Sequence, residues 1–249
     1  MSLLIDVALT PDNIKGAWKN KIWLVVDVLR ATSTIVTLLA HGCKRVYTVS
    51  SIEASRALSK SSGGILCGER DGLTLPGFEM GNSPCEARDS DIRGKLVILT
   101  TTNGTKAIKK VAGAKDLIAA SFLNAGACCE YALITANDTG QGIGILCAGE
   151  RRRFVLDDAY CAGYLAETLK DLAEEKNLDI GISDACQAVI QLYNSYPDPI
   201  VAFKDSGSGR RLLEIERKDD LYFCGKIDKY SIIPLFQSNS YYYFEKAWP

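Results

Sequence analysis

The sequence predicts an α/β protein with three layers, α/β/α, a largely parallel or mixed sheet and a C-terminal antiparallel addition. Over the first two-thirds of the 249-residue chain, short apolar segments alternate with amphipathic helical segments. Near residue 196 the helical period gives way to short alternating pieces. Alternation of strands and helices favours parallel strands, because each crossover helix returns the chain to the same end of the sheet.

The predicted elements can be assigned in chain order. The strands are IWLVVDV, RVYTV, GILC, KLVILTT, DLIAAS and GIGILC. Helices are predicted at ATSTIVTLLAHG, SSIEASRALSK, NAGACCEYALI and DDAYCAGYLAETLKDLAEE. Ile35, Leu38 and Leu39 share one face of the first helix, and Ser50 and Glu53 have capping-box spacing at the start of the second. The last helix carries an apolar stripe made of Ala162, Leu165, Ala166, Leu169 and Leu172.

Two regions interrupt this alternation. Residues 68–84, GERDGLTLPGFEMGNSP, have no period and predict a long ordered loop, a type of segment that is often functional. The second interruption begins at residue 196. We therefore predict an α/β core over residues 1–195, which carries the active-site loops, and a C-terminal subdomain over residues 196–249 packed on that core.

The composition is that of a soluble globular protein, with 47% hydrophobic and 24% charged residues. A net charge of −1 leaves no basic footprint for nucleic acid, and no apolar run is long enough to cross a membrane. Nine scattered cysteines without a CxxC pair predict buried, reduced thiols and a cytoplasmic location. His41 is the only histidine, which argues against a zinc site.

Acidic, basic and hydroxyl side chains follow the predicted strands. Ligands in open α/β sheets bind at the carboxyl ends of strands, where loops and helix N-termini meet. Taken singly, the acids could be helix caps or partners of neighbouring arginines. Together they indicate a site for an oxyanion and for a hard cation such as Mg2+, which needs few carboxylates. The residues are Asp27, Arg30, Thr32, Ser33, Glu69, Arg70, Asp71, Glu150, Arg151, Asp157 and Asp158.

The segment TTTNGTKA, residues 100–107, joins a predicted strand to a predicted helix. Exposed N–H groups and the helix dipole at such a junction favour an anion, with Thr102, Asn103, Gly104 and Thr105 as the contacting residues. An ordinary N-cap turn is the alternative. SGSGR, residues 206–210, is either a plain turn or a second anion-binding loop.

Several catalytic patterns are absent or weak. His41 falls at the end of a helix, so it cannot complete a Ser-His-Asp triad at the strand ends, and neither GxSxG nor GxxxxGK[ST] occurs. Leu29 occupies the position of the second acid in the DxDx[TV] loop of aspartyl-phosphate phosphatases. Cys147 and Arg153 match the CX5R loop of cysteine-dependent phosphatases, but the apolar setting of Cys147 predicts a raised pKa and a poor nucleophile.

Five separated segments occur in the order of a known family: VVDVLRATST, GERDGLTLPGFEMGNSP, TTNGTKA, CAGERRRFVLDDAYCAG, and SGSGRRL with DDLYFCGKID. With these motifs the chain resembles the Mg2+-dependent 2-phosphosulfolactate phosphatases, the ComB family, from about residue 5 to about residue 237. The resemblance implies hydrolysis of 2-phospho-3-sulfolactate to 3-sulfolactate and phosphate, a step of coenzyme M biosynthesis.

A substrate with phosphate, carboxylate and sulfonate groups requires several cationic partners. Arg30, Arg70 and Arg210 suit this role, together with Thr32, Ser33 and the TTNGT turn. We expect Mg2+ to be held by Asp27 with Glu69 and Asp157. Either Asp27 attacks phosphorus directly, or Asp158 orients a water molecule.

Two other functions stay open at this point. One is a cysteine-dependent phosphatase that uses Cys147 and Arg153. The other is a non-catalytic binding protein for an anionic metabolite, although carboxylates facing an anion argue against it. The expected partner is a small anionic phosphoester, without nucleic acid or membrane, and a homo-oligomer is a further expectation.

Overall fold

The structure is a computed structural model that describes residues 3–14, 16, 18–101 and 104–247. The strands are β1 (Leu3–Ala8), β2 (Lys21–Val26), β3 (Arg45–Thr48), β4 (Ile65–Arg70), β5 (Leu73–Thr74), β6 (Leu96–Thr100), β7 (Leu117–Ala120), β8 (Gly142–Cys147), β9 (Ile180–Ile182), β10 (Pro234–Ser238) and β11 (Tyr242–Lys246). The α-helices are α1 (Ala31–Ala40), α2 (Ile52–Ser62), α3 (Pro84–Asp89), α4 (Gly104–Val111), α5 (Ala125–Thr139), α6 (Leu156–Glu175), α7 (Asp184–Asn194), α8 (Pro199–Asp205), α9 (Gly207–Glu214) and α10 (Lys218–Cys224). Three short 3-10 helices are η1 (Pro11–Asn13), η2 (Trp18–Asn20) and η3 (Phe122–Asn124).

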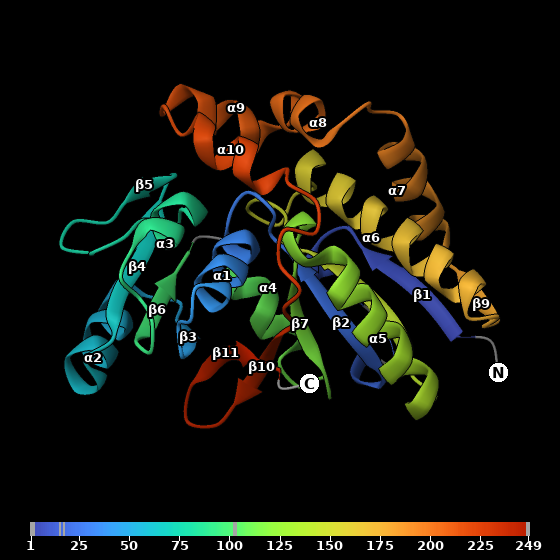
Figure 1. Ribbon diagram of the computed structural model, residues 1–249, viewed down its shortest axis with the longest axis horizontal. Helices are drawn as coiled ribbons and strands as arrows, with labels where there is room; N and C mark the ends of the chain where they lie inside the picture. Colours follow the sequence, from blue (N-terminus) through green and yellow to red (C-terminus); the bar gives the residue numbers. More distant parts are fainter. Residues whose placement is uncertain (1–2, 15, 17, 102–103, 248–249) are drawn as a thin grey trace.

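The described strands form one sheet in the order β5-β4-β6-β3-β11-β10-β7-β2-β8-β1-β9. Two parallel blocks make up most of it: a first block of β4, β6 and β3, and a second block of β7, β2, β8, β1 and β9. The C-terminal hairpin, β10 with β11, pairs antiparallel with β7 on one side and β3 on the other. The hairpin therefore joins the two blocks, as Figure 1 shows at the end of the molecule opposite α8–α10.

Helices cover both faces of the second block. On β2, Ile22, Leu24 and Val26 belong to the core beneath α5, α6 and α7, whereas Trp23 and Val25 belong to the core beneath α1 and α4. Alternate residues of a strand point to opposite faces, so a strand with apolar residues throughout is one that is buried on both sides. The predicted α/β class with a largely parallel sheet and an antiparallel C-terminal addition is confirmed (Figure 1).

The segment after residue 195 differs from its predicted pattern. Short alternating pieces were expected from residue 196, but α8, α9 and α10 come first, and SGSGR is the start of α9 rather than a turn. These helices lie over the strand ends (Figure 1). Seven- and eight-residue helices offer too few turns for a clear 3.6-residue period. The division of the chain at residue 195 stays a prediction.

Local sequence patterns predicted most of the other helices and strands correctly. All six predicted strands are present, but β1 and β9 were not predicted. The N-cap of α2 is Ser51, whose side chain accepts the Ala54 N–H, and not Ser50. The expected long loop begins with the hairpin of β4 and β5 before it becomes irregular. No helix in the described ranges is long and apolar enough to cross a membrane.

Candidate active site

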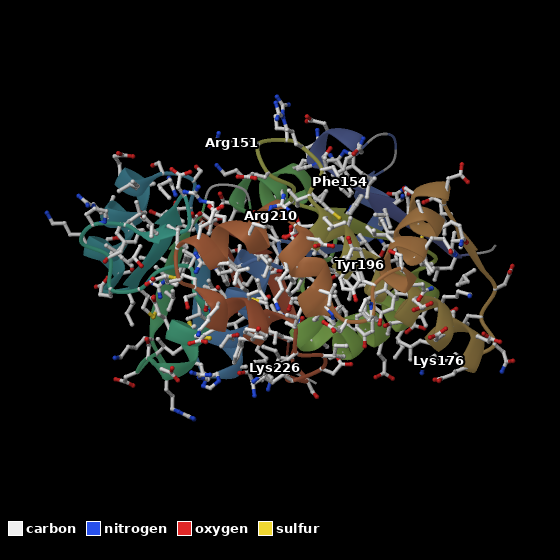
Figure 2. The ribbon with its side chains drawn as sticks, turned by 90° about the horizontal axis from the view of Figure 1, so that it is seen from above. Arg151, Phe154, Lys176, Tyr196, Arg210 and Lys226 are labelled. Atoms are coloured by element: carbon white, nitrogen blue, oxygen red, sulfur yellow. The ribbon has the colours of Figure 1, made fainter. Side chains whose placement is uncertain are left out.

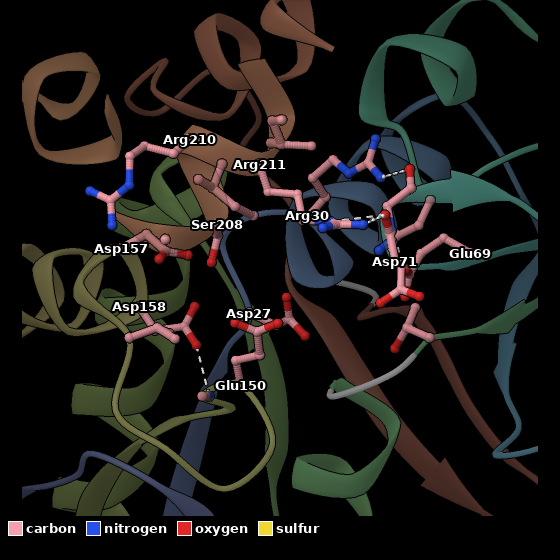
Figure 3. A pocket seen from close by; sticks show the side chains of 18 of the residues that line it. Asp27, Arg30, Glu69, Asp71, Glu150, Asp157, Asp158, Ser208, Arg210 and Arg211 are labelled. Carbon is pink, nitrogen blue, oxygen red and sulfur yellow. Dashed lines mark hydrogen bonds between the residues drawn. The ribbon is translucent and has the colours of Figure 1, made fainter. Parts of the chain in front are cut away.

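A cavity of about 500 Å³ lies where the carboxyl ends of strands from both blocks meet α6 and α9. Figure 3 shows Asp27 between two groups of acids, with Asp157 and Asp158 on one side and Glu69 and Asp71 on the other. The residues that line the cavity are Asp27, Leu29, Arg30, Glu69, Asp71, Gly72, Asn82, Thr101, Gly149, Glu150, Arg151, Val155, Asp157, Asp158, Gly207, Ser208, Arg210, Arg211, Leu212 and Glu214.

The sheet must twist strongly for these residues to meet. Three successive antiparallel pairings separate β3 from β7, and in a flat sheet they would send the carboxyl ends of the two blocks to opposite edges. The cavity nevertheless has lining residues from the ends of β2 and β8 and from the ends of β4 and β6. The sheet is therefore not flat between the two blocks, where one residue pair joins β10 to β7 and two pairs join β11 to β3.

Asp27 follows β2 and stands at the N-terminus of α1. Its Oδ1 accepts the Ala31 N–H at 3.3 Å, and its carbonyl accepts the N–H and the hydroxyl of Thr32 at 2.9 and 3.0 Å. On the other side, a Cβ atom at Gly104 would lie 2.8 Å from Oδ2 of Asp27. Gly104, which was predicted to cradle an anion, therefore keeps space beside the Asp27 carboxyl group.

The pKa values of Asp27 and Asp157 are raised because the two groups are buried beside other acids. Burial raises the pKa of Asp27 to about 7, and the charges of Asp157 and Glu69 add to the rise. Burial raises the pKa of Asp157 to about 6, with the Ser208 hydroxyl opposing the rise and Glu150 adding to it. Carboxyl groups that disfavour one another's ionisation favour a nearby cation.

Asp158 is held by the main chain of two loops. Its Oδ1 accepts the Val28 N–H at 2.9 Å and its Oδ2 accepts the Gly149 N–H at 3.0 Å. Burial raises its pKa well above the usual value, and the nearby Asp157 and Asp27 raise it further. Because both oxygens are occupied, Asp158 ties the loop after β2 to the loop after β8 and restricts its own movement.

Arg30, a predicted substrate ligand, lines the cavity but already has a buried partner. Its Nη1 donates to Oδ2 of Asp220 at 2.6 Å, and its Nη2 donates to the Gly72 carbonyl at 2.7 Å. The other oxygen of Asp220 accepts the Ser83 hydroxyl at 2.6 Å and the Cys85 N–H at 3.3 Å. Sequence reasoning missed Asp220, whose only signal was its place in the DDLYFCGKID motif.

Three further arginines surround the mouth of the cavity. Arg210, on α9, is exposed and donates to the Asp205 carbonyl at 2.6 Å. Arg211 donates from Nε and Nη2 to the Asp71 carbonyl, both at 3.1 Å, and Arg151 lies 3.7 Å from the Asp71 carboxylate. Figure 2 shows Arg151 and Arg210 on the same face of the molecule. Arg211 was not among the predicted residues.

Five predicted binding residues that the structure describes do not line the cavity: Gly104, discussed above, and Thr32, Ser33, Arg70 and Thr105. The hydroxyls of Thr32 and Ser33 donate to main-chain carbonyls of the loop before α1. Arg70 and Thr105 likewise donate to carbonyls of their own segments. The other two predicted residues of the TTNGT turn, Thr102 and Asn103, lie outside the described residues.

The CX5R match has no support in the geometry. Cys147 ends β8 and is 1% exposed, and burial raises the pKa of its thiol well above the usual value. It does not line the cavity, and Arg153 is exposed in the following loop. A protonated thiol inside the core is a poor nucleophile.

Unpartnered polar atoms concentrate at the cavity. In the described part of the chain, four buried side-chain oxygens have no hydrogen-bond partner: Thr34 Oγ1, Asn82 Oδ1, Thr101 Oγ1 and Asp157 Oδ1. The last three belong to residues that line the cavity. A buried oxygen without a partner costs about 1–3 kcal/mol, so a group that binds here and supplies hydrogen bonds or charge gains that energy.

The residues present fit a magnesium ion. No group of three or more His, Cys, Asp or Glu side chains in the described ranges is arranged to hold a metal. Magnesium requires fewer, since it is commonly bound by one or two carboxylates and keeps several water molecules. Oδ1 of Asp157 is buried without a partner, and Gly104 leaves Oδ2 of Asp27 uncovered. Carboxylate oxygens are suitable donors for such a hard cation.

Comparison with known proteins agrees with this chemistry. The profile of the 2-phosphosulpholactate phosphatase family matches residues 8–239. A protein of Carboxydothermus hydrogenoformans named "Probable 2-phosphosulfolactate phosphatase" is 38% identical over 231 residues, which cover 92% of each chain. Proteins of the same name from Clostridium acetobutylicum and Thermotoga maritima are 36% and 39% identical, over 92% and 85% of this chain and 96% and 87% of theirs.

The match extends over nearly the whole chain and includes every strand that contributes a residue to the cavity. The enzymes that give the family its name are phosphoric monoester hydrolases. This chain belongs to the 2-phosphosulfolactate phosphatase family.

Proposed function

We propose that this protein hydrolyses 2-phospho-3-sulfolactate to 3-sulfolactate and phosphate, and that the reaction requires Mg2+. The observation that carries the proposal is the pair Asp27 and Asp157, two carboxyl groups with raised pKa values in one cavity, with an unpartnered oxygen on Asp157. Family membership supports the phosphatase reaction and this substrate class.

Asp27 and Asp157 would hold the cation. Glu69, the third ligand expected from the sequence, lines the same cavity but does not form a three-carboxylate group with them in the described ranges. When bound, Mg2+ would supply positive charge that stabilises the negative charge developing on the phosphoryl oxygens. Without a cation, a pKa of about 7 leaves Asp27 partly protonated near neutral pH. The cation would therefore also keep Asp27 ionised.

The arginines would bind the anionic groups of the substrate. Arg210 is the most suitable, because it lines the cavity and donates to the Asp205 carbonyl rather than to a carboxylate that would balance its charge. Arg30 lines the cavity too, but Asp220 already balances its charge, so it contributes hydrogen bonds to the substrate more than net charge. Arg211 adds a guanidinium group on the same helix as Arg210.

Two routes remain for the attack on phosphorus. In one, the Asp27 carboxylate displaces the leaving oxygen and forms a phospho-enzyme, which water then hydrolyses. In the other, a carboxylate orients a water molecule for direct attack. Asp158 is less suited to that task than the sequence suggested, because its two oxygens accept main-chain N–H groups. Trapping a phospho-enzyme under single-turnover conditions distinguishes the routes.

The test is phosphate release from 2-phospho-3-sulfolactate and from phosphoesters without a sulfonate, with Mg2+ and with EDTA. We expect EDTA to abolish release and Asp27→Asn to lower kcat/KM at least about a hundredfold. Asp91→Asn is the matched control, because Asp91 forms an exposed pair with Lys95 away from the cavity. Full activity in EDTA, or full activity of Asp27→Asn, would refute the proposal.

A further inference from the structure

Two of the unpartnered oxygens belong to Asn82 and Thr101. Neither was singled out as a site residue from the sequence, although Thr101 begins the TTNGT turn. Asn82 is 4% exposed and Thr101 is 4% exposed, and both line the cavity. Neighbouring polar groups in the same two segments do have hydrogen-bond partners. The next residue, Ser83, donates to Asp220, and Thr105 donates to the Thr101 carbonyl.

Both residues lie beside β4, the strand that carries Glu69. Thr101 directly follows β6, whose Thr100 pairs with Gly68 of β4. On the other edge of β4, Met80, two residues before Asn82, is bridged to Cys67. The side of the cavity that carries Glu69 therefore also carries the Asn82 amide oxygen and the Thr101 hydroxyl. Each residue follows closely on a residue that pairs with β4.

The chemistry of the Asn82 and Asp157 oxygens limits what can satisfy them, whereas the Thr101 hydroxyl can both donate and accept. An amide oxygen and an ionised carboxylate oxygen only accept hydrogen bonds, so they require a donor. The phosphate, carboxylate and sulfonate groups of the proposed substrate mainly present acceptors. Water molecules around a cation direct their oxygens inward and their hydrogens outward, and therefore act as donors to the surrounding protein.

Thr101 is also close to the proposed cation ligand Asp27. A Cβ atom at Gly104 would lie 2.8 Å from Oδ2 of Asp27 and 3.4 Å from Oγ1 of Thr101. Both oxygens therefore border the same small space. A cation held at Asp27 would bring its water molecules within reach of the Thr101 hydroxyl.

We propose that Asn82 and Thr101 accept hydrogen bonds from the water molecules of the cation bound at Asp27 and Asp157, and so position that hydrated cation in the cavity. The inference rests on the proposed function, because it assumes that the cavity takes Mg2+. It adds a second wall to the cation site, built from neutral oxygens. Residues that hold a metal's outer ligands typically contribute about ten- to hundredfold to its affinity.

The test is the Mg2+ dissociation constant of the substrate-free protein, measured by isothermal titration calorimetry. Thr101→Val removes the hydroxyl with little change in shape, and Asn82→Leu removes the amide. We expect each to weaken Mg2+ binding about tenfold or more. Thr101→Ser and Asn82→Asp keep an oxygen at each position, so we expect them to retain the affinity of the wild type or to exceed it.

Thr34→Val is the matched control. Thr34 also carries a buried, unpartnered hydroxyl and is 0% exposed, but it lies in α1 and does not line the cavity. Both Thr→Val variants remove an unsatisfied group, so neither should lower the melting temperature. Only Thr101→Val should weaken Mg2+ binding.

The outcomes separate this inference from the proposed function. If the wild type binds no Mg2+, the metal requirement of the proposed function fails, and the inference fails with it. If the wild type binds Mg2+ and Thr101→Val and Asn82→Leu bind it equally well, only the inference is overturned. A raised KM for phosphosulfolactate with unchanged Mg2+ affinity would also overturn it, since the residues would then contact the substrate.

Discussion

The ion pair between Arg30 and Asp220 predicts a large and specific effect of Asp220→Asn. The two side chains are 4% and 2% exposed, and their charged atoms are 2.6 Å apart. Loss of one charge leaves the other buried without a counter-ion, which typically costs about 3–5 kcal/mol. For a chain of this length, that lowers the melting temperature by about 6–20 °C. A displaced Arg30 should also lower kcat/KM about a hundredfold.

The assay is urea unfolding of the wild type and Asp220→Asn, with Asp91→Asn as the control. Asp91 pairs with Lys95 at 2.8 Å on the surface, with side chains 86% and 46% exposed, so its loss should cost less than about 1 kcal/mol. The double variant Arg30→Met/Asp220→Leu removes both charges and should recover part of the stability but none of the activity. A loss below about 1 kcal/mol in Asp220→Asn would refute this account of the pair.

Three other predictions concern the acids, the glycine beside them and the core thiol. Folding raises the pKa of Asp27 to about 7 and the pKa of Asp157 to about 6, from values near 4 in the unfolded chain. The stability that these groups contribute is therefore complete below pH 4 and is lost as the pH rises through the two folded-state pKa values. In EDTA, the free energy of unfolding should therefore fall by a few kcal/mol between pH 5 and pH 7.5, and Asp27→Asn should flatten that fall; an equally steep fall in the variant would contradict the assignment. Gly104→Ala places a Cβ atom 2.8 Å from Oδ2 of Asp27 and should lower Mg2+ affinity by about tenfold. Gly207→Ala is the control, because a Cβ atom there meets open space. Equal Mg2+ affinities of the two variants in calorimetry would show that the space beside Asp27 is unimportant. Cys147→Ser should lose about 1–3 kcal/mol of stability but keep its phosphatase activity, and loss of phosphate release in a folded variant would revive the cysteine mechanism.

Local sequence patterns were sufficient to predict most strands of the second block and the acidic residues of the site. IWLVV, residues 22–26, is apolar at every position because β2 is buried on both faces, and such a strand is easily recognised in a sequence. Asp27, Asp157, Asp158 and Glu69 all line the cavity, because each lies at the carboxyl end of a strand or in the first turn of the next helix. The rule that ligands bind at the carboxyl ends of strands located them without any structure.

The missing residues depend on contacts that no local pattern records. Asp220 is 190 positions from Arg30 in the chain, and its own surroundings resemble an ordinary acidic first turn of a helix. Thr32 and Ser33 have suitable chemistry for binding an anion, but their hydroxyls turn back to main-chain carbonyls. Residue type can be judged from the sequence, whereas the direction of a side chain is decided by packing against distant segments.

The place of the C-terminal hairpin in the sheet has a consequence for the synthesis of the chain. A ribosome releases β10 and β11 after the other strands that the structure describes, yet these two strands join the block that carries Glu69 to the block that carries Asp27. Before they emerge, each half of the site is attached to a separate piece of sheet. We therefore expect catalysis to begin only when translation of the hairpin is finished, and a chain cut before Pro234 to contain all the lining residues without assembling the cavity they form.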